Sequence, residues 1–102
     1  MSTWHRFAAV DELPRGQSKS SICGGMPVAV FNVDGRFYAA GNVCPHAGGP
    51  LCEGWVEDDY VVCPWHGWSF TLSPHDAPND GLPRYRTKIE GGAIYVEIPN
   101  QS

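Results

Sequence analysis

The sequence has no long apolar run, and this absence limits the classes of protein to be considered. No stretch approaches the roughly 18 apolar residues of a membrane-spanning helix. The segment Met1–Arg6 also lacks the apolar core of a secretory signal peptide. From these two absences we expect a soluble, cytoplasmic protein.

Positive charge and catalytic motifs are scarce as well. Seven Lys and Arg residues stand against eleven Asp and Glu residues, which gives a formal net charge of −4 at pH 7. This negative net charge argues against nucleic acid and anionic membranes as partners. It would complement a basic patch on the surface of a partner protein. No P-loop, Ser–His–Asp or paired-carboxylate arrangement in the sequence rises above chance, and we expect a protein that is not itself an enzyme.

Helical periodicity is the third absence. No segment sustains a 3.6-residue repeat, and nine prolines with twelve glycines discourage long helices. We expect an all-β fold, an antiparallel sandwich or small barrel forming one domain over residues 1–102. Turn pairs predict hairpins at Asp34-Gly35, Asp58-Asp59 and Gly91-Gly92. The predicted strands are Trp4–Ala9, Ser18–Cys23, Pro27–Val33, Arg36–Ala40, Trp55–Glu57, Tyr60–Val62, Pro83–Glu90 and Ala93–Ile98. Val10–Pro14 is predicted as a one-turn helix or turn, and Leu72–Leu82 as an exposed loop.

What the sequence does contain is a pair of short Cys and His clusters. Cys44 and His46 form the first, Cys63 and His66 form the second, and sixteen residues separate His46 from Cys63. Each Cys is followed by proline, which stiffens the chain. Gly48, Gly49 and Gly67 stand in similar places after the two histidines, and we expect them to allow positive φ and to bring N–H groups close to a bound cofactor. The two clusters therefore predict two similar loops that hold a metal centre together.

Two metal assignments compete for these four side chains. Two thiolates and two imidazoles suit a single tetrahedral zinc, and they also suit a [2Fe–2S] cluster with two Cys on one iron and two His on the other. Zinc modules usually pair like ligands, whereas each pair here is mixed. A cluster with two unlike irons accounts for the mixing, because each loop then contributes one ligand to each iron.

At these residues the sequence resembles the Rieske [2Fe–2S] family. The likeness is carried by CPHAGGPL at 44–51 and CPWHGWSF at 63–70. It implies one Rieske-type [2Fe–2S] cluster per chain, bound in a subdomain of about 42–71. By position, Cys44 and Cys63 correspond to the ligands of the buried iron, and His46 and His66 to the ligands of the outer iron near the surface.

Differences from other members of the family indicate the kind of centre. High-potential members carry an additional Cys in each loop, joined as a disulfide, and those positions correspond here to Gly49 and Trp65. The same members have Ser and Tyr hydroxyls that donate to the cluster, at the positions of Trp68 and Phe70. Because hydrogen bonds to sulfur stabilise the more negative reduced cluster, their loss lowers the reduction potential. The resemblance therefore implies a low-potential centre.

The resemblance implies electron transport as the function. The protein is expected to be a ferredoxin that carries single electrons from a flavin-dependent reductase to a terminal oxidoreductase such as a ring-hydroxylating oxygenase. One alternative is the Rieske-like small subunit of an assimilatory NAD(P)H nitrite reductase, partnered by its large subunit. A further alternative is a zinc-stapled interaction domain.

The remaining cysteines and histidines are interpreted without a cofactor. Cys23 and Cys52 are expected to be reduced packing residues, although they could pair as a disulfide. His75 and His5 are expected to be surface histidines. Trp65 and Trp68 are expected to cover the cluster and keep water from it.

Overall fold

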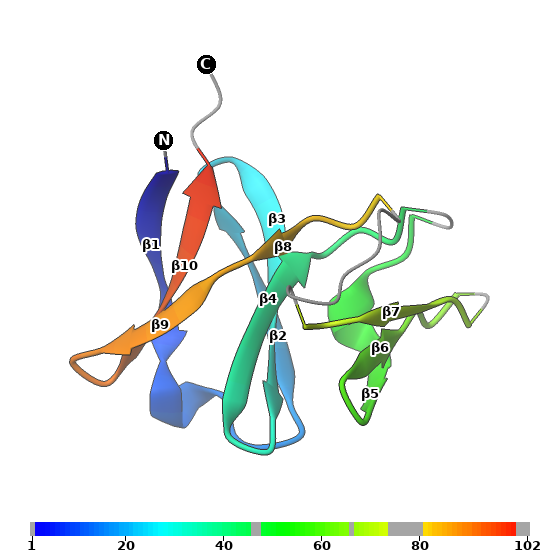
Figure 1. Cartoon of the computed structure of the whole chain (residues 1–102), viewed down its shortest axis with the longest axis horizontal. Coiled ribbons are helices and arrows are strands. Elements are labelled where there is room, and N and C mark those ends of the chain that lie inside the picture. The colour runs from blue at the N-terminus through cyan, green and yellow to red at the C-terminus, as the bar shows by residue number, and fades with distance from the viewer. Residues whose placement is uncertain (1, 46–47, 66, 74–80, 100–102) are drawn as a thin grey trace.

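Ten strands and two single-turn 3₁₀ helices make up the regular structure of the described residues (Figure 1). The computed structural model describes residues 2–45, 48–65, 67–73 and 81–99. The strands are β1 (Ser2–Ala9), β2 (Ser18–Cys23), β3 (Met26–Val33), β4 (Arg36–Gly41), β5 (Trp55–Glu57), β6 (Tyr60–Val62), β7 (Ser69–Thr71), β8 (Arg84–Tyr85), β9 (Thr87–Glu90) and β10 (Ala93–Pro99). The 3₁₀ helices are η1 (Val10–Glu12) and η2 (Leu51–Glu53). The predicted all-β class is confirmed.

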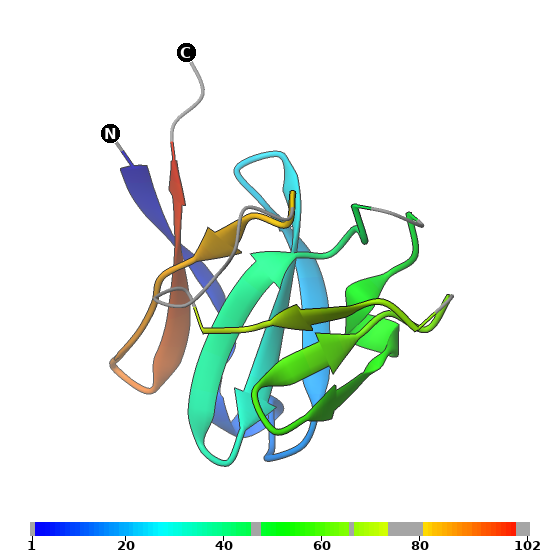
Figure 2. The ribbon, with the colours of Figure 1, turned by 45° about the vertical axis from the view of Figure 1, so that its right-hand side comes forward.

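The strands form three antiparallel sheets. Their strand orders are β1-β10-β9, β2-β3-β4-β8 and β5-β6-β7. Two views show β5-β6-β7 beside the β2-β3-β4-β8 sheet, and β1 with β10 on its other side (Figures 1 and 2). The four-stranded sheet is therefore the middle layer of the fold.

Strand β3 explains why the described residues form two hydrophobic cores. Its residues 28–31 are all fully or almost fully buried, and successive side chains of a strand point to opposite faces. Val28 and Val30 pack in the core shared with β10, whereas Ala29 and Phe31 pack in the core shared with β5-β6-β7. An apolar run without alternation thus marks a strand that is covered on both sides.

The predicted hairpin turns lie where their sequences place them. Asp34 and Gly35 both have positive φ, 53° and 90°, and the side-chain oxygen of Asn32 accepts the Gly35 N–H at 2.8 Å. Two consecutive left-handed residues give the turn whose twist matches the flanking strands. Asp58 has a φ of 54° in the turn between β5 and β6. The hairpin at Gly91-Gly92 joins β9 to β10.

Three predictions about the fold are corrected. The single strand expected over Pro83–Glu90 is two strands, because β8 pairs with β4 while β9 pairs with β10, and the chain changes sheets at Arg86. Leu72 and Leu82, at the ends of the expected exposed loop, are buried in the core, and residues 74–80 lie outside the described residues. His5 is half-buried in β1, where its ring lies against Gly24. No described helix has the length and apolar character needed to cross a membrane.

Candidate metal centre

Two loops that close in the same way carry the predicted cysteine ligands. In the first loop the Cys44 N–H donates to the carbonyl of Gly49 at 2.9 Å, and in the second the Cys63 N–H donates to the carbonyl of Trp68 at 2.7 Å. Each bond spans five residues. Gly48 and Gly67, four residues after each Cys, have φ of 75° and 74°. The near-repeat of the sequence is therefore a near-repeat of backbone conformation.

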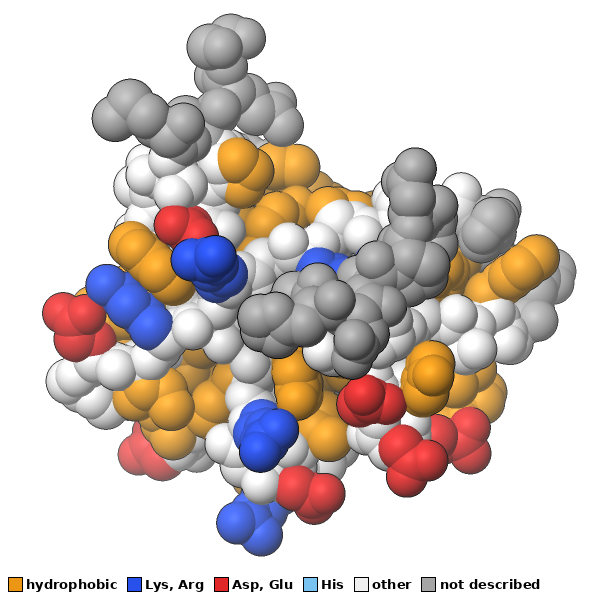
Figure 3. Space-filling model, viewed as in Figure 1, with side chains coloured by type: hydrophobic (Ala, Val, Ile, Leu, Met, Phe, Trp, Pro, Cys, Tyr) orange, Lys and Arg blue, Asp and Glu red, His pale blue; other side chains and the backbone are white. Residues whose placement is uncertain are grey.

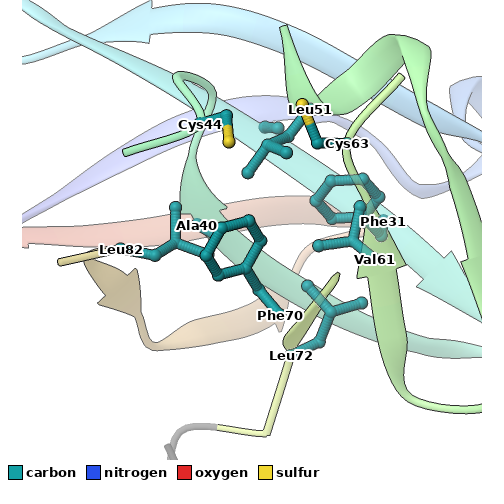
Figure 4. Close-up of a cluster of buried hydrophobic side chains, with 10 residues drawn as sticks. Phe31, Ala40, Cys44, Leu51, Val61, Cys63, Phe70, Leu72 and Leu82 are labelled. Carbon is teal, nitrogen blue, oxygen red and sulfur yellow. The ribbon is translucent and has the colours of Figure 1, made fainter. Parts of the chain in front are cut away.

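The structure brings the two cysteines together. Cys44 and Cys63 are 1% and 0% exposed, and their thiols are hydrogen-bonded to each other. In Figure 4 both sulfur atoms lie at one end of the buried cluster, near Leu51, with the rings of Phe31 and Phe70 beyond them. Two thiols from separate loops thus converge in a buried, apolar environment.

Burial raises the pKa of the Cys63 thiol, and the neighbouring Cys44 thiol raises it further. The backbone N–H of Trp65 donates to the Cys63 sulfur and acts in the opposite direction. Without a metal, Cys63 therefore retains its proton at neutral pH. A cation bound between the two sulfurs would replace the proton and the hydrogen bond together.

Gly49 is required because the loops pack closely at that point. A Cβ atom at Gly49 would lie 2.8 Å from the Trp65 ring and 3.3 Å from the Cys63 sulfur. The φ of Gly49 is not positive, so the expectation of positive φ is wrong there and right for Gly48 and Gly67. The Gly48 N–H donates to the carbonyl of Cys44 at 2.8 Å, which closes the turn of loop one. The contact also places Gly49 beside Trp65, the two positions matched to the disulfide of high-potential relatives.

Loop one is held by an asparagine that the sequence analysis did not single out. The backbone carbonyl of Asn42 accepts the Leu51 N–H at 3.0 Å, and its side-chain oxygen accepts the Cys52 N–H at 2.8 Å. The Ser18 hydroxyl donates to the Cys52 carbonyl at 2.6 Å. A lone Asn at the end of a predicted strand was the only sequence signal for this clamp.

Strand β7 is the second element that sequence reasoning missed. It pairs with β6 so that Val61 lies opposite Phe70 and Val62 lies opposite Ser69. Loop two therefore connects two paired strands, β6 before it and β7 after it. Three residues are too few for alternation to be visible in a sequence. The predicted β5-β6 hairpin therefore delivers Cys63 as expected, but β7 completes the frame.

The remaining candidate cysteines and tryptophans differ in burial. Cys23 and Cys52 are both free thiols, in contact with different cores, which agrees with their expected role as packing residues. Trp65 and Trp68 are 51% and 47% exposed. About half of each side chain is therefore in contact with the protein, and the other half faces solvent. His46, His66 and His75 lie outside the described residues.

The described donor atoms suit the thiolate side of an iron–sulfur centre. Two converging, buried thiols on stiff loops, with a glycine that leaves space beside one sulfur, are what a cluster held by paired cysteines needs. Within the described ranges no group of three or more Cys, His, Asp or Glu side chains converges, since both candidate histidines fall in the gaps.

Comparisons with known proteins give the same assignment. The model of the Rieske [2Fe-2S] domain matches residues 3–86. The chain is 37% identical over 95 residues to the 3-phenylpropionate/cinnamic acid dioxygenase ferredoxin subunit of Escherichia coli, covering 88% of this chain and 89% of the relative. It is 35% identical over 97 residues to human apoptosis-inducing factor 3, covering 91% of this chain but spanning only 16% of that longer protein.

Solved structures with the same fold include proteins of two kinds. The crystal structure of a Mycobacterium tuberculosis protein assigned as the small subunit of an NADH-dependent nitrite reductase aligns with a TM-score of 0.83 at 26% identity, over 99% of both chains. A chain in the complex of reduced oxygenase and oxidised ferredoxin of carbazole 1,9a-dioxygenase aligns with a TM-score of 0.78 at 26% identity, over 91% of both chains.

Proposed function

This chain belongs to the Rieske [2Fe–2S] domain family, and we propose that it is a low-potential ferredoxin that carries single electrons between redox proteins. The observation that carries the proposal is the convergence of two buried thiols on paired loops of the same conformation. The family and the ferredoxin relatives with nearly the same length support one Rieske-type cluster per chain.

The proposed ligands are Cys44 and Cys63 for the inner iron and His46 and His66 for the outer iron. When bound, the [2Fe–2S] cluster supplies a one-electron couple. The chain's own part is to bury the thiolates, to stiffen both loops through the bonds between residues 44 and 49 and between 63 and 68, and to donate the Trp65 N–H to sulfur. These contributions limit structural change when the charge at the site changes.

Residues 1–102 are proposed to be one domain, with residues 42–71 as its cluster-binding subdomain. Both loops, η2 and the β5-β6-β7 sheet fall within that range. The protein is proposed to have no catalytic activity of its own and to work in the cytoplasm. Its proposed partners are a flavin-dependent reductase and a terminal oxygenase, as the oxygenase–ferredoxin complex of the carbazole dioxygenase relative suggests.

A second candidate function is the small subunit of a nitrite reductase. It is favoured by the alignment over 99% of both chains with the mycobacterial protein. The two functions differ in whether the partner is permanent. A small subunit is expected to purify from its native host as a stable complex with a larger subunit, whereas a shuttle is expected to elute alone in size-exclusion chromatography.

Purification under mild conditions tests the metal. We expect a coloured protein with two irons per chain and the low-temperature EPR signal of a reduced Rieske centre. A colourless, EPR-silent protein with stoichiometric zinc would instead identify a zinc-stapled interaction domain and exclude the electron carrier.

The potential can be tested at Phe70. Phe70 is 3% exposed and packs in the same buried cluster as Cys44 and Cys63. In Phe70→Tyr the added hydroxyl can donate toward the thiolates, and one such hydrogen bond is expected to raise the one-electron potential by on the order of 50 mV. Protein-film voltammetry measures this shift, and Phe31→Tyr, in the same cluster on β3, is the control. An unchanged potential in Phe70→Tyr would contradict the assigned reason for the low potential.

A further inference from the structure

On the outer face of the β5-β6-β7 sheet, Val62 and Thr71 are buried, whereas the side chains around them are exposed. Val56, Val61 and Phe70 point into the core, so the alternate residues point outward. The strand register places Trp55 beside Val62 and Glu57 beside Tyr60 on that outer face. Trp55 and Tyr60 are 52% and 48% exposed. Two large aromatic side chains exposed on one sheet face are typical of an interaction surface.

Exposed apolar side chains are concentrated in this part of the molecule. Of the seven large hydrophobic residues that are exposed among those described, five fall within residues 42–71. These five are Val43, Trp55, Tyr60, Trp65 and Trp68. A hollow of about 390 Å³ lies on the sheet face, lined by Glu57, Asp58, Tyr60, Val62 and Ser69. Since Val62 precedes Cys63 and Ser69 follows Trp68, the face is continuous with loop two.

Charge indicates what kind of surface covers this face. No Lys or Arg occurs between Arg36 and Arg84, and the same stretch holds six of the eleven acidic residues. Four of the six are described, and they surround the hairpin: Glu53, Glu57, Asp58 and Asp59. Figure 3 shows acidic side chains gathered near β5 and β6, and most of the basic side chains on the other layers. The two copies of a symmetric dimer would repel each other here, because each would present the same negative charge.

We propose that the outer face of β5-β6-β7 is a docking surface for a redox partner protein that presents a basic rim around an apolar patch. The inference deepens the proposed function and rests on it. Trp55 and Tyr60 supply the apolar contact, the hollow beside Tyr60 accepts a projecting side chain, and Glu57 and Asp58 pair with the basic rim. A partner seated there contacts loop two and so lies near the cysteine ligands. Attraction between opposite charges would speed encounter and orient the partner.

The test uses mitochondrial cytochrome c, a basic redox protein, as the probe. Its binding is measured by isothermal titration at 10 mM and 300 mM ionic strength, so the readout does not require electron transfer. Glu57→Lys is expected to weaken binding about tenfold at low ionic strength and far less at high ionic strength, where surface charges are screened. Tyr60→Ser is expected to weaken binding about fivefold at both.

Two control variants make the same chemical changes elsewhere. Asp11→Lys, in η1, changes the net charge as much as Glu57→Lys, and Ile89→Ser, in β9, removes another exposed apolar side chain. Both are expected to change binding less than twofold. Equal weakening by Glu57→Lys and Asp11→Lys would mean that only net charge matters, and this would overturn the proposal. No binding at low ionic strength, or a dimer formed through this face, would overturn it as well.

Metal analysis and EPR of the same samples keep the two proposals separate. A colourless preparation that binds cytochrome c with the expected order of variants would refute the electron carrier, and with it the redox role of the partner, but it would leave a docking surface for a basic protein. A preparation with a Rieske-type signal and unchanged binding in Glu57→Lys would refute the docking surface alone.

Discussion

Cys63→Ala is expected to abolish the visible absorption of the protein and to reduce its iron content from two per chain to a small residual fraction. Cys63 is 0% exposed and hydrogen-bonded to Cys44, so the variant removes one of only two converging thiols. One remaining sulfur ligand cannot hold an iron that needs two. Because metal binding contributes directly to folding free energy, the melting temperature is expected to fall by about 10 °C or more. Absorption spectra, iron analysis and calorimetry measure these changes.

Cys23→Ala is the matched control for this prediction. Cys23 is also a buried free cysteine, 4% exposed, but it lies in the other hydrophobic core. Removal of its sulfur is expected to cost about 1 kcal/mol through a small cavity and to leave absorption and iron content unchanged. Retention of a full cluster in Cys63→Ala, or equal loss of iron in both variants, would contradict the ligand assignment.

Gly54→Ala is expected to produce the largest loss of stability among simple glycine substitutions. Gly54 lies between η2 and β5, and a Cβ atom there would overlap the backbone carbonyl oxygen of Val62. Its φ of −78° and ψ of −158° are accessible to alanine, so the cost is steric. A backbone atom cannot rotate away as a side chain can, and we expect a loss of about 3 kcal/mol in the free energy of unfolding. Since Val62 precedes Cys63, a shift there also moves loop two.

Gly25→Ala separates this steric cost from the cost of a positive φ. Gly25 has a φ of 80°, and a Cβ atom there would meet no other atom within 4 Å. Its substitution is expected to cost about 1 kcal/mol through backbone strain alone. Urea denaturation of both variants gives the comparison. A Gly54→Ala variant no less stable than Gly25→Ala would show that the loops separate without cost.

Much of the fold was predictable because local signals agreed with the tertiary structure. Asp34-Gly35 specified its hairpin, since two consecutive positive φ angles are accessible to Asp and Gly at little cost. The unbroken apolar run of β3 marked a strand covered on both faces. The point at which the chain passes from one sheet to the other was not predictable. Nothing in the local sequence at Arg86 indicates that β8 pairs with β4 while β9 pairs with β10.

The ligand types of the site could be predicted from the sequence, whereas the contacts around them could not. Cys44 and Cys63 are each followed by proline and glycine at the same offsets, so residue type alone predicts a soft metal centre between two similar loops. The Asn42 clamp on loop one and the contact of Gly49 with Trp65 depend on residues distant in the chain, so only the tertiary structure could decide them. The same holds for the outer face of β5-β6-β7. Its aromatic and acidic residues meet because antiparallel register, which no residue encodes by itself, aligns Trp55 with Val62 and Glu57 with Tyr60.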